Sequence, residues 1–313
     1  WFTGESAARV AVGCAFALLD ALHDVERIEV PGGESALLGL KVAVSSGSVR
    51  RFVVGAPQQI DVLAGATVAR TGAGESIAER SEVLADARTV ERSATWARVQ
   101  AWRDADGERF AVLARPDALP FVPPAPLPLD NAPPAGELRR WMLPAVADYL
   151  QAGLGEYVTE LRPATALFVR FAGIRYDDDP DAERKLDRFV GMIQGVVARY
   201  EGSVLQLTIG DKGSYIYAAF GAPFTHEDDA ARALNAALDI RAEVRTLDYL
   251  EPVRIGVSAG MMRTGAYGGE TRRTYGVLGD EVNLAARLMM LASPDDIFVS
   301  ESVIGAHADG FVL

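Results

Sequence analysis

The stretch Tyr275-Gly-Val-Leu-Gly-Asp-Glu-Val-Asn-Leu-Ala-Ala-Arg-Leu288 decides the fold of this 313-residue chain. Its beginning predicts the end of a strand over residues 274–278, and the Gly-Asp pair predicts a turn into a helix. That helix is expected over residues 280–291. Within it Asn283 and Arg287 are four residues apart, so both side chains lie on one face. From the spacing alone, a solvated helix face is favoured over a binding site.

The residues that precede this stretch alternate between strand and helix patterns. Ala164-Thr-Ala-Leu-Phe-Val-Arg-Phe171 is a largely apolar run typical of a central strand. Residues 182–200 carry apolar side chains at helical spacing, and residues 203–220 predict a hairpin that turns at Gly210-Asp-Lys-Gly-Ser214. The further elements expected are a helix over 227–247, a strand over 253–259 and a last strand over 297–300. Strand–helix–strand–strand–helix–strand predicts a ferredoxin-like core of the α+β class with an added strand and helix.

A proline-rich segment interrupts the chain, Phe121-Val-Pro-Pro-Ala-Pro-Leu-Pro-Leu-Asp-Asn-Ala-Pro-Pro-Ala-Gly136. Proline at this density fixes φ and removes backbone donors, so an extended linker is expected. Residues 137–157 then follow the pattern of a helix. We therefore predict three parts, which are residues 1–120, a linker with a connecting helix over 121–160, and residues 161–313.

The two halves share a repeated motif. Lys41-Val-Ala-Val-Ser-Ser-Gly-Ser-Val-Arg50 matches Arg254-Ile-Gly-Val-Ser-Ala-Gly-Met-Met-Arg263, and Val53-Val-Gly55 matches Ala266-Tyr-Gly268, at a constant separation of 213 positions. A repeat of this length indicates a duplicated domain rather than a solenoid. The first residue of the chain corresponds to about position 220 of the second copy, so the first copy is expected to lack its opening strands and first helix.

The composition argues against several classes of protein. The net charge is −12 and no Lys/Arg cluster is present, whereas a nucleic-acid surface needs a basic face. No apolar run approaches the ~20 residues that span a bilayer. The single cysteine, Cys14, excludes an internal disulfide and fits a reducing compartment, so a cytoplasmic location is expected. An acidic chain can still bind a nucleotide, because one pocket needs only a few local cations.

Three segments stand in the order found in class III nucleotide cyclases. They are the strand over 164–171, Gln206-Leu-Thr-Ile-Gly-Asp-Lys-Gly-Ser-Tyr-Ile-Tyr-Ala-Ala-Phe-Gly-Ala-Pro223, and the run over 254–288. Val282-Asn-Leu-Ala-Ala-Arg287 after a Gly-Asp turn is specific to that class, and Asp211-Lys-Gly213 narrows the match. The second half thus resembles the second catalytic domain of the bicarbonate-responsive soluble adenylyl cyclases. The first half resembles the latter part of that family's first domain. The implied fold is two ferredoxin-like cyclase homology domains in tandem, the first truncated at its N-terminus.

The resemblance implies an activity and two catalytic residues. Such enzymes convert ATP to cyclic AMP and pyrophosphate between two homologous domains, here within a larger signalling protein. The family's ribose-positioning Asn matches Asn283. Its transition-state Arg matches Arg287, and a guanidinium fork suits phosphate because it presents several donors at once.

Four further residues are candidates for binding the nucleotide. The family's base-reading positions fall on Gln206 and Gly276. Glutamine both donates and accepts hydrogen bonds, so the choice between adenine and guanine stays open, although the overall likeness favours ATP. Asp211 and Lys212 are either a further part of this site or a polar hairpin tip.

The metal ligands are expected elsewhere. Members of the family hold two Mg²⁺ or Mn²⁺ ions with two aspartates of one domain, and the first of those positions is Arg170 in this half. The ligands are therefore expected upstream of Trp1. In the first copy the counterpart of the signature is Ala66-Thr-Val-Ala-Arg-Thr-Gly-Ala73, where small residues replace the Asn and Arg. The halves would complement each other in one productive site, and this stretch of chain alone is expected to be inactive.

A second interpretation stays open. The chain can instead be a catalytically inactive module that senses nucleotides or dimerises and thereby regulates a downstream ATPase. Metal-binding aspartates upstream of Trp1 would favour the enzyme, and their absence would favour the sensor. The bicarbonate-binding arginine of the resembled family has no evident counterpart near Gly72.

Overall fold

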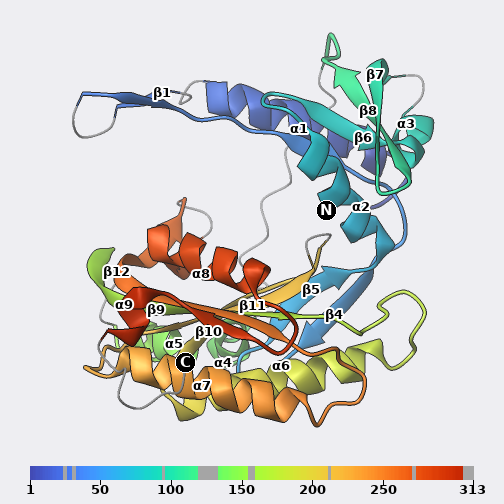
Figure 1. Cartoon of the computed structure of the whole chain (residues 1–313). Helices are drawn as coiled ribbons and strands as arrows, with labels where there is room; N and C mark the ends of the chain where they lie inside the picture. Colours follow the sequence, from blue (N-terminus) through green and yellow to red (C-terminus); the bar gives the residue numbers. More distant parts are fainter. Residues whose placement is uncertain are drawn as a thin grey trace. The chain divides into compact units, whose positions relative to one another are not determined.

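The structure is a computed structural model of the chain (Figure 1). It describes residues 1–23, 27–29, 33–93, 96–118, 133–153, 159–210, 213–269 and 273–305, so most of the predicted proline-rich linker lies outside the described residues. The chain divides into two compact units. Unit 1 comprises Trp1–Arg50, Leu63–Asp130 and Gly210–Lys212, and unit 2 comprises Arg51–Val62, Asn131–Ile209 and Gly213–Leu313. Within the described residues, no helix has the length and hydropathy required for a membrane span.

Unit 2 is built on a mixed sheet. Its strands are β9 (Glu160–Phe171), β10 (Ser203–Thr208), β11 (Ser214–Phe220), β12 (Arg254–Gly268), β13 (Arg273–Leu278) and β14 (Ile297–Val299). They lie in the order β10-β11-β9-β12-β13, and β14 pairs in parallel with β12. The α+β class and the strand–helix–strand–strand–helix–strand order are confirmed. One strand differs, because β12 continues nine residues past the predicted end at 259 to pair with β13.

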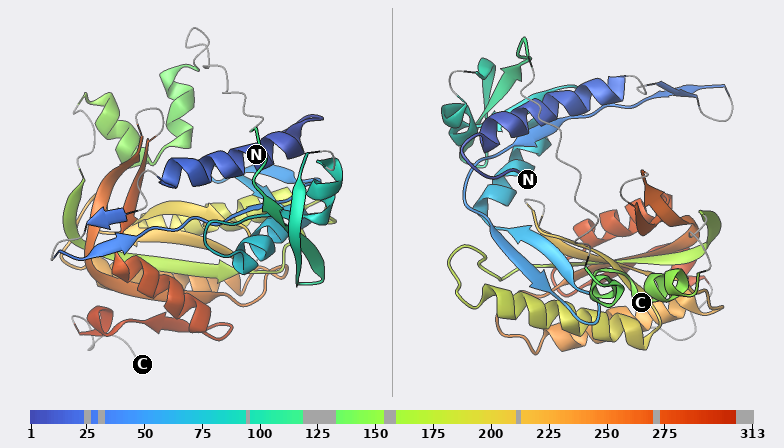
Figure 2. Two further views of the ribbon diagram at one scale, coloured as in Figure 1. Left: turned by 90° about the horizontal axis from the view of Figure 1, so that it is seen from above. Right: turned by 180° about the vertical axis from the view of Figure 1, so that it is seen from behind.

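Helices cover both faces of this sheet. Helices α6 (Ala182–Arg199) and α7 (Asp229–Val244) lie along one face, and α8 (Asp280–Leu291) lies along the other (Figures 1 and 2). The predicted amphipathic pattern of α6 is confirmed, since Leu186, Phe189 and Ile193 are fully buried. Burial of a side chain of this size is worth about 1.5–3 kcal/mol, so this stripe holds α6 to the sheet.

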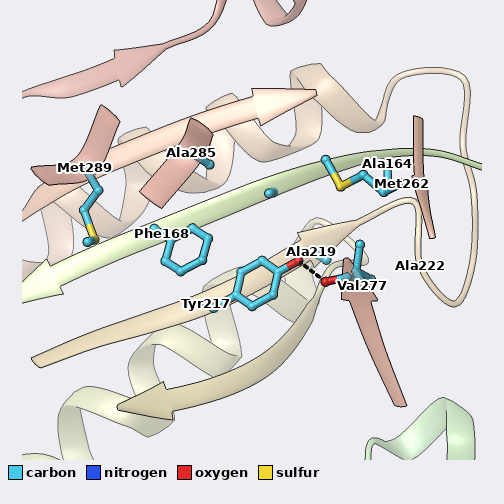
Figure 3. Close-up of a cluster of buried hydrophobic side chains, with 10 residues drawn as sticks. Ala164, Phe168, Tyr217, Ala219, Ala222, Met262, Val277, Ala285 and Met289 are labelled. Carbon is cyan, nitrogen blue, oxygen red and sulfur yellow. Dashed lines mark hydrogen bonds between the residues drawn. The ribbon is translucent and has the colours of Figure 1, made fainter. Parts of the chain in front are cut away.

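The face under α8 has its own apolar cluster (Figure 3). The rings of Phe168 on β9 and Tyr217 on β11 stack with centroids 4.5 Å apart and planes 6° apart. Ala285 and Met289 of α8 pack against this cluster. The Tyr217 hydroxyl donates a 3.1 Å hydrogen bond to the carbonyl of Val277, which links β11 to β13 although the two strands are not paired.

The segment before β9 is less regular than predicted. Instead of one helix over 137–157, the structure has α4 (Ala135–Leu138), a 3-10 turn η2 (Arg139–Trp141) and α5 (Pro144–Gln151). Pro144 is the reason for the break, because proline has no N–H to continue a helix and is favoured at its first position. A last short helix, α9 (Glu301–Ile304), follows β14.

Unit 1 contains a four-stranded sheet of order β3-β6-β8-β7. Its strands are β3 (Val42–Val44), β6 (Val83–Asp86), β7 (Arg98–Ala105) and β8 (Glu108–Ala114), and its helices are α1 (Ala7–His23), α2 (Ala66–Ile77) and α3 (Ala87–Arg92). Phe16 of α1 is buried with Val83 and Ala85 on one face, and Ala73 of α2 is buried with Leu84 on the other. Two short exposed strands, β1 (Arg27–Glu29) and β2 (Ser35–Leu37), pair with each other.

The repeated motif occupies equivalent elements. Val42 of β3 pairs in parallel with Val83 of β6, as Ile255 of β12 pairs with Ile297 of β14. Next along the chain, β4 (Arg50–Val54) and β5 (Ile60–Ala64) pair with each other as a two-stranded sheet, and in the second half the end of β12 pairs with β13 within the six-stranded sheet. The same order of strands and helices therefore follows the repeated sequence in both halves of the chain.

Candidate functional site

Helix α8 is held very close to the sheet at one glycine. A Cβ built on Gly256 of β12 would lie 2.1 Å from the carbonyl oxygen of Ala285 and 2.4 Å from the amide nitrogen of Met289. No side chain fits there, and because glycine has none, the backbone of α8 packs directly on β12. The position of every side chain on the outer face of α8 depends on this contact.

Asn283 and Arg287 lie on that outer face. Both are exposed, whereas Ala285 and Met289, which point to the sheet, are buried at 0% and 3% exposure. Among the described residues, the structure records no hydrogen bond or ion pair for the amide of Asn283 or the guanidinium of Arg287. The amide and the guanidinium are therefore available to a ligand, side by side on a rigid element.

The two candidate base-reading positions lie on β10 and β13, and a hydrogen bond joins β11, the neighbour of β10, to β13. Gln206 of β10 is exposed and pairs directly with Tyr217 of β11, so both side chains point to the face that α8 covers. Gly276 of β13 precedes Val277, whose carbonyl accepts the Tyr217 hydroxyl. The Gln206 amide donates a 3.0 Å hydrogen bond to the Thr208 hydroxyl, which orients it along its own strand.

The other two candidates, Asp211 and Lys212, lie outside the described residues. The residue that follows them, Gly213, is described and has a left-handed φ of +92°. A Cβ at Gly213 would meet the Arg170 Nε at 2.6 Å, so Gly213 and the Arg170 guanidinium are adjacent. Glycine is the residue that tolerates both this φ and this closeness.

The described residues do not fit a metal pair. The sequence motif predicts that Arg170 on β9 stands where the resembled family has its first metal-binding aspartate. In the structure the Arg170 guanidinium approaches the Met290 sulfur of α8 at 3.8 Å. No group of three or more His, Cys, Asp or Glu side chains that could hold a metal ion occurs in the part of the chain that the structure describes. A cation at this position repels Mg²⁺, so the described residues around Arg170 do not fit a bound metal ion.

One cavity of about 310 Å³ lies beside this region and is mostly apolar. Leu205 of β10 and Tyr275 of β13, the neighbours of Gln206 and Gly276, belong to its wall. The rest of its wall is Gln58, Trp141, Met142, Leu143, Val146, Leu150, Ala266, Arg273 and Thr274. None of the four described candidate residues (Asn283, Arg287, Gln206 and Gly276) lines the cavity, so it is a separate space next to these residues.

The corresponding helix of unit 1 carries different chemistry. Gly65 before α2 and Gly279 before α8 are equivalent helix starts, and counting from them places Ala69 and Ala73 where α8 has Asn283 and Arg287. The side chains there are small, in agreement with the sequence analysis.

Unit 1 instead contains a buried ion pair that sequence reasoning missed. The Arg70 Nε donates to Asp86 Oδ2 at 3.1 Å, and the two side chains are only 7% and 2% exposed. The backbone amides of Ser46 and Thr89 also donate to this carboxylate. The sequence offered no signal for the pair, because Arg70 and Asp86 are 16 residues apart in different elements.

Comparison with known proteins identifies relatives of the second half. Residues 184–310 match the model of the family described as "Adenylate and Guanylate cyclase catalytic domain", and this range contains all six candidate residues. Adenylate cyclase type 10 of Homo sapiens is 33% identical over 138 residues, which are 43% of this chain and 8% of that protein. The aggregation-specific adenylate cyclase of Dictyostelium discoideum is 29% identical over 150 residues, 47% of this chain and 10% of that protein. The chain thus spans about a tenth or less of the length of these relatives.

Among solved structures, the adenylyl cyclase CyaB from P. aeruginosa is similar with a TM-score of 0.46 and 22% identity, over 50% of this chain and 85% of that one. The guanylyl cyclase Cya2 is similar with a TM-score of 0.42 and 28% identity, over 47% of this chain and 79% of that one. The resemblance to cyclases that the sequence motifs predicted is confirmed by the family match and by the type 10 relatives.

Proposed function

We propose that unit 2 is one half of an adenylyl cyclase site, because residues 184–310 match the model of the adenylate and guanylate cyclase catalytic-domain family. The reaction proposed is the conversion of ATP to cyclic AMP and pyrophosphate. The observation that carries the proposal is the exposed pair Asn283 and Arg287 on a helix seated directly on the sheet. We place this activity in the cytoplasm, as part of a larger signalling protein.

The two side chains have different roles in this proposal. The Asn283 amide donates and accepts hydrogen bonds, so it can hold the ribose ring in the geometry of attack. The Arg287 guanidinium presents its fork of donors to the phosphate oxygens on which charge accumulates in the transition state. Their i, i+4 spacing lets both reach one nucleotide from one helix.

The base is proposed to lie between β10 and β13, near Gln206 and Gly276. ATP is our first choice because the curated relatives named above are adenylate cyclases. Gln206 alone does not enforce this choice, since its amide can serve either purine. Asp211 and Lys212, which lie outside the described residues and precede Gly213 in the sequence, are proposed to contribute to the same nucleotide site.

The partner of unit 2 is proposed to be the first half of the same chain, completed by sequence upstream of Trp1. The equivalent order of elements in the two halves supports a tandem pair of homologous domains. Because β9 offers Arg170 in place of a carboxylate, we assign the Mg²⁺ or Mn²⁺ ligands to the partner domain, upstream of Trp1.

The decisive experiment uses the chain within its complete protein, with ATP and GTP assayed side by side in Mg²⁺ and in Mn²⁺. Arg287→Ala should lower the turnover by about 10²–10³-fold, the typical effect of removing one preorganised donor to transition-state charge. Arg184→Ala is the matched control, because Arg184 lies on α6 at the opposite face of the sheet, and its exposed ion pair with Asp181 is worth little. Unchanged cyclic-nucleotide production by Arg287→Ala in a folded protein would refute the proposal.

The rival function, an inactive nucleotide sensor, is favoured by the guanidinium of Arg170 where a metal-binding carboxylate would stand. It predicts saturable ATP binding and no cyclic product in the presence of either metal ion. It also predicts that the Arg287→Ala and Arg287→Lys variants bind ATP equally well, because the phosphate contacts then contribute little to binding. Detection of cyclic AMP that disappears with Arg287→Ala would exclude it.

A further inference from the structure

Two arginines lie directly opposite each other on the sheet of unit 2. Arg170 of β9 pairs with Arg254 of β12, two residues beyond the pair of Phe168 with Gly256. Phe168 belongs to the apolar cluster under α8, and Gly256 lies against the backbone of that helix. Because side chains on one face of a strand recur every second residue, both arginines point to the face that α8 covers. Residues directly opposite in an antiparallel pair have their Cβ atoms about 4.5–5.5 Å apart, so the two side chains start close together.

Neither guanidinium has a carboxylate partner in the described part of the chain. Both side chains are half-buried. Among the described residues, the structure records one side-chain contact for Arg170, with the Met290 sulfur at 3.8 Å, and no side-chain hydrogen bond or ion pair for Arg254. On the other side of Arg170 the sheet has Tyr215 of β11, which carries no charge. Two like charges therefore face each other, an arrangement that destabilises a sheet unless something neutralises it.

The end of α8 accounts for only part of this charge. Arg170 reaches Met290, and the helix ends at the next residue, Leu291. A helix C-terminus carries about −0.5 elementary charge, whereas each guanidinium carries a full positive charge. The chain as a whole is acidic, with a net charge of −12, so the pair is not part of a generally basic chain. An anion from outside the chain would complete the neutralisation.

The Arg170 guanidinium is positioned before any ligand binds. A Cβ on Gly213 would lie 2.6 Å from the Arg170 Nε and 3.1 Å from its Nη2, so the glycine leaves the guanidinium the room that it occupies. Met290 contacts the same guanidinium from α8. A donor that is already held in place loses less conformational freedom on binding, which favours affinity.

The chemistry of the pair favours a phosphate group. A guanidinium presents its donors in a planar fork that matches phosphate or carboxylate oxygens two at a time. Two forks from neighbouring strands need an anion with more than two acceptor oxygens and more than one negative charge. A phosphate monoester meets both conditions, with three acceptor oxygens and a charge of about −1.5 to −2 at pH 7. A carboxylate has two oxygens and a single charge, so it satisfies only one of the arginines.

We infer that Arg170 and Arg254 form a phosphate-binding site on unit 2 that includes neither Asn283 nor Arg287. Its ligand is a phosphate group, either free inorganic phosphate or the phosphate of a nucleotide. The bound group bridges β9 and β12 near the end of α8 and replaces the repulsion between the two arginines by attraction to a shared anion. The inference goes beyond the proposed function, because it requires no cyclase reaction and no metal ion.

The test measures binding of inorganic phosphate to the full chain by isothermal titration calorimetry in the absence of divalent metal. We expect saturable binding of one phosphate per chain. Arg170→Gln and Arg254→Gln should each weaken it by about 10–100-fold, the effect of losing a hydrogen bond to a charged group. Arg254→Lys keeps the charge and loses the fork, so its affinity should be intermediate. Arg263→Gln is the matched control and should bind phosphate as the unmodified chain does, because it removes a charge from the opposite face of β12, next to Met262, which packs under α8.

Urea denaturation separates a binding site from a merely structural role. In chloride, Arg254→Gln should raise the urea midpoint, because it relieves the repulsion between the two arginines. In phosphate at matched ionic strength, the unmodified chain should gain stability from binding, and Arg254→Gln should not. If Arg254→Gln lowers the midpoint equally in both buffers, the guanidinium only supports the fold, and the inference is overturned.

Competition with ATP, again without metal, distinguishes the two sources of phosphate. Displacement of bound phosphate by ATP but not by adenosine supports a nucleotide phosphate as the ligand, and binding of phosphate alongside ATP supports the free ion. The site is overturned if the unmodified chain shows no saturable phosphate binding, or if both glutamine variants bind as tightly as it does. It is also overturned if phosphate binds only to Asp211→Asn, because the chain's own carboxylate would then be the counter-ion.

Discussion

Substituting Gly256 by alanine tests how strongly the sheet determines the position of α8. The new Cβ would lie 2.1 Å from the Ala285 oxygen, whereas ordinary van der Waals contact begins near 3.4 Å. The obstructing atoms are helix backbone, which cannot rotate away as a side chain can. The helix must therefore retreat from β12 by more than about 1 Å, a displacement that overpacking of this kind produces at a cost of about 1–3 kcal/mol.

The same displacement moves Asn283 and Arg287, which lie on the far side of the helix. A misplacement of about 1 Å in groups that position a substrate lowers turnover by about 10²-fold. We expect Gly256→Ala to lower the free energy of unfolding by about 1–3 kcal/mol. Urea denaturation followed by circular dichroism measures the loss of stability in this chain, and cyclic-nucleotide assays of the complete protein measure the loss of turnover.

Gly195→Ala is the matched control. Gly195 lies in the interior of α6, and nothing is found within 4 Å of the Cβ it lacks. Alanine is more favourable than glycine inside a helix by about 0.5–1 kcal/mol, so this variant should be slightly more stable and fully active. If Gly256→Ala were as stable and as active as Gly195→Ala, α8 would not depend on the glycine contact, and our account of how the site is positioned would fail.

Three further predictions concern buried polar groups. Asp86→Ala leaves the Arg70 guanidinium buried without its partner and should destabilise unit 1 by about 3–5 kcal/mol in urea denaturation, with part of the loss recovered in Arg70→Leu/Asp86→Ala. Burial raises the pKa of Tyr176 to about 12 from 10, so the folded protein holds this proton more tightly. The contribution of Tyr176 to stability should be constant below about pH 10 and should fall by roughly 2–3 kcal/mol between pH 10 and 12. Tyr176→Phe should reduce that slope, and an unchanged slope would contradict the assignment. Tyr217→Phe removes the hydrogen bond to the buried carbonyl of Val277 and should cost about 1–3 kcal/mol, measured as a lower midpoint in urea, whereas Tyr215→Phe should cost less.

The regular elements of unit 2 could be predicted because each carries its own local pattern. The apolar stripe of α6 and the Gly-Asp start of α8 are readable from neighbouring residues, and both elements are found within two residues of the predicted limits. The apolar periodicity of residues 137–157 predicts one continuous helix, and this prediction is wrong because Pro144 starts a new helix. The missing N–H of this one proline determines the local structure more strongly than the helical spacing of the residues around it.

The contacts between distant elements could not be predicted. Nothing in the residues around Gln194 indicates that its amide binds the backbone of Ala56, 138 positions away. The sequence also gives no indication that Arg70 is buried with Asp86, because an arginine on a helix is usually solvated. The exposure of Asn283 and Arg287 agrees with the roles that the family motif predicts for them, and the proposed function draws on both.

Residues 51–62, which belong to unit 2, change where this chain can be divided. A cut in the proline-rich segment severs the covalent connection but leaves residues 51–62 seated on α6. Two fragments nicked at that point should therefore migrate together and separate only in denaturant. A recombinant piece that starts after the segment would lack residues 51–62. The Gln194 amide would then lose its protein partners, and the apolar surface that covers Phe52 and Val54 would be exposed, which favours self-association. Fragment complementation, rather than isolated expression, is the way to obtain the second half intact.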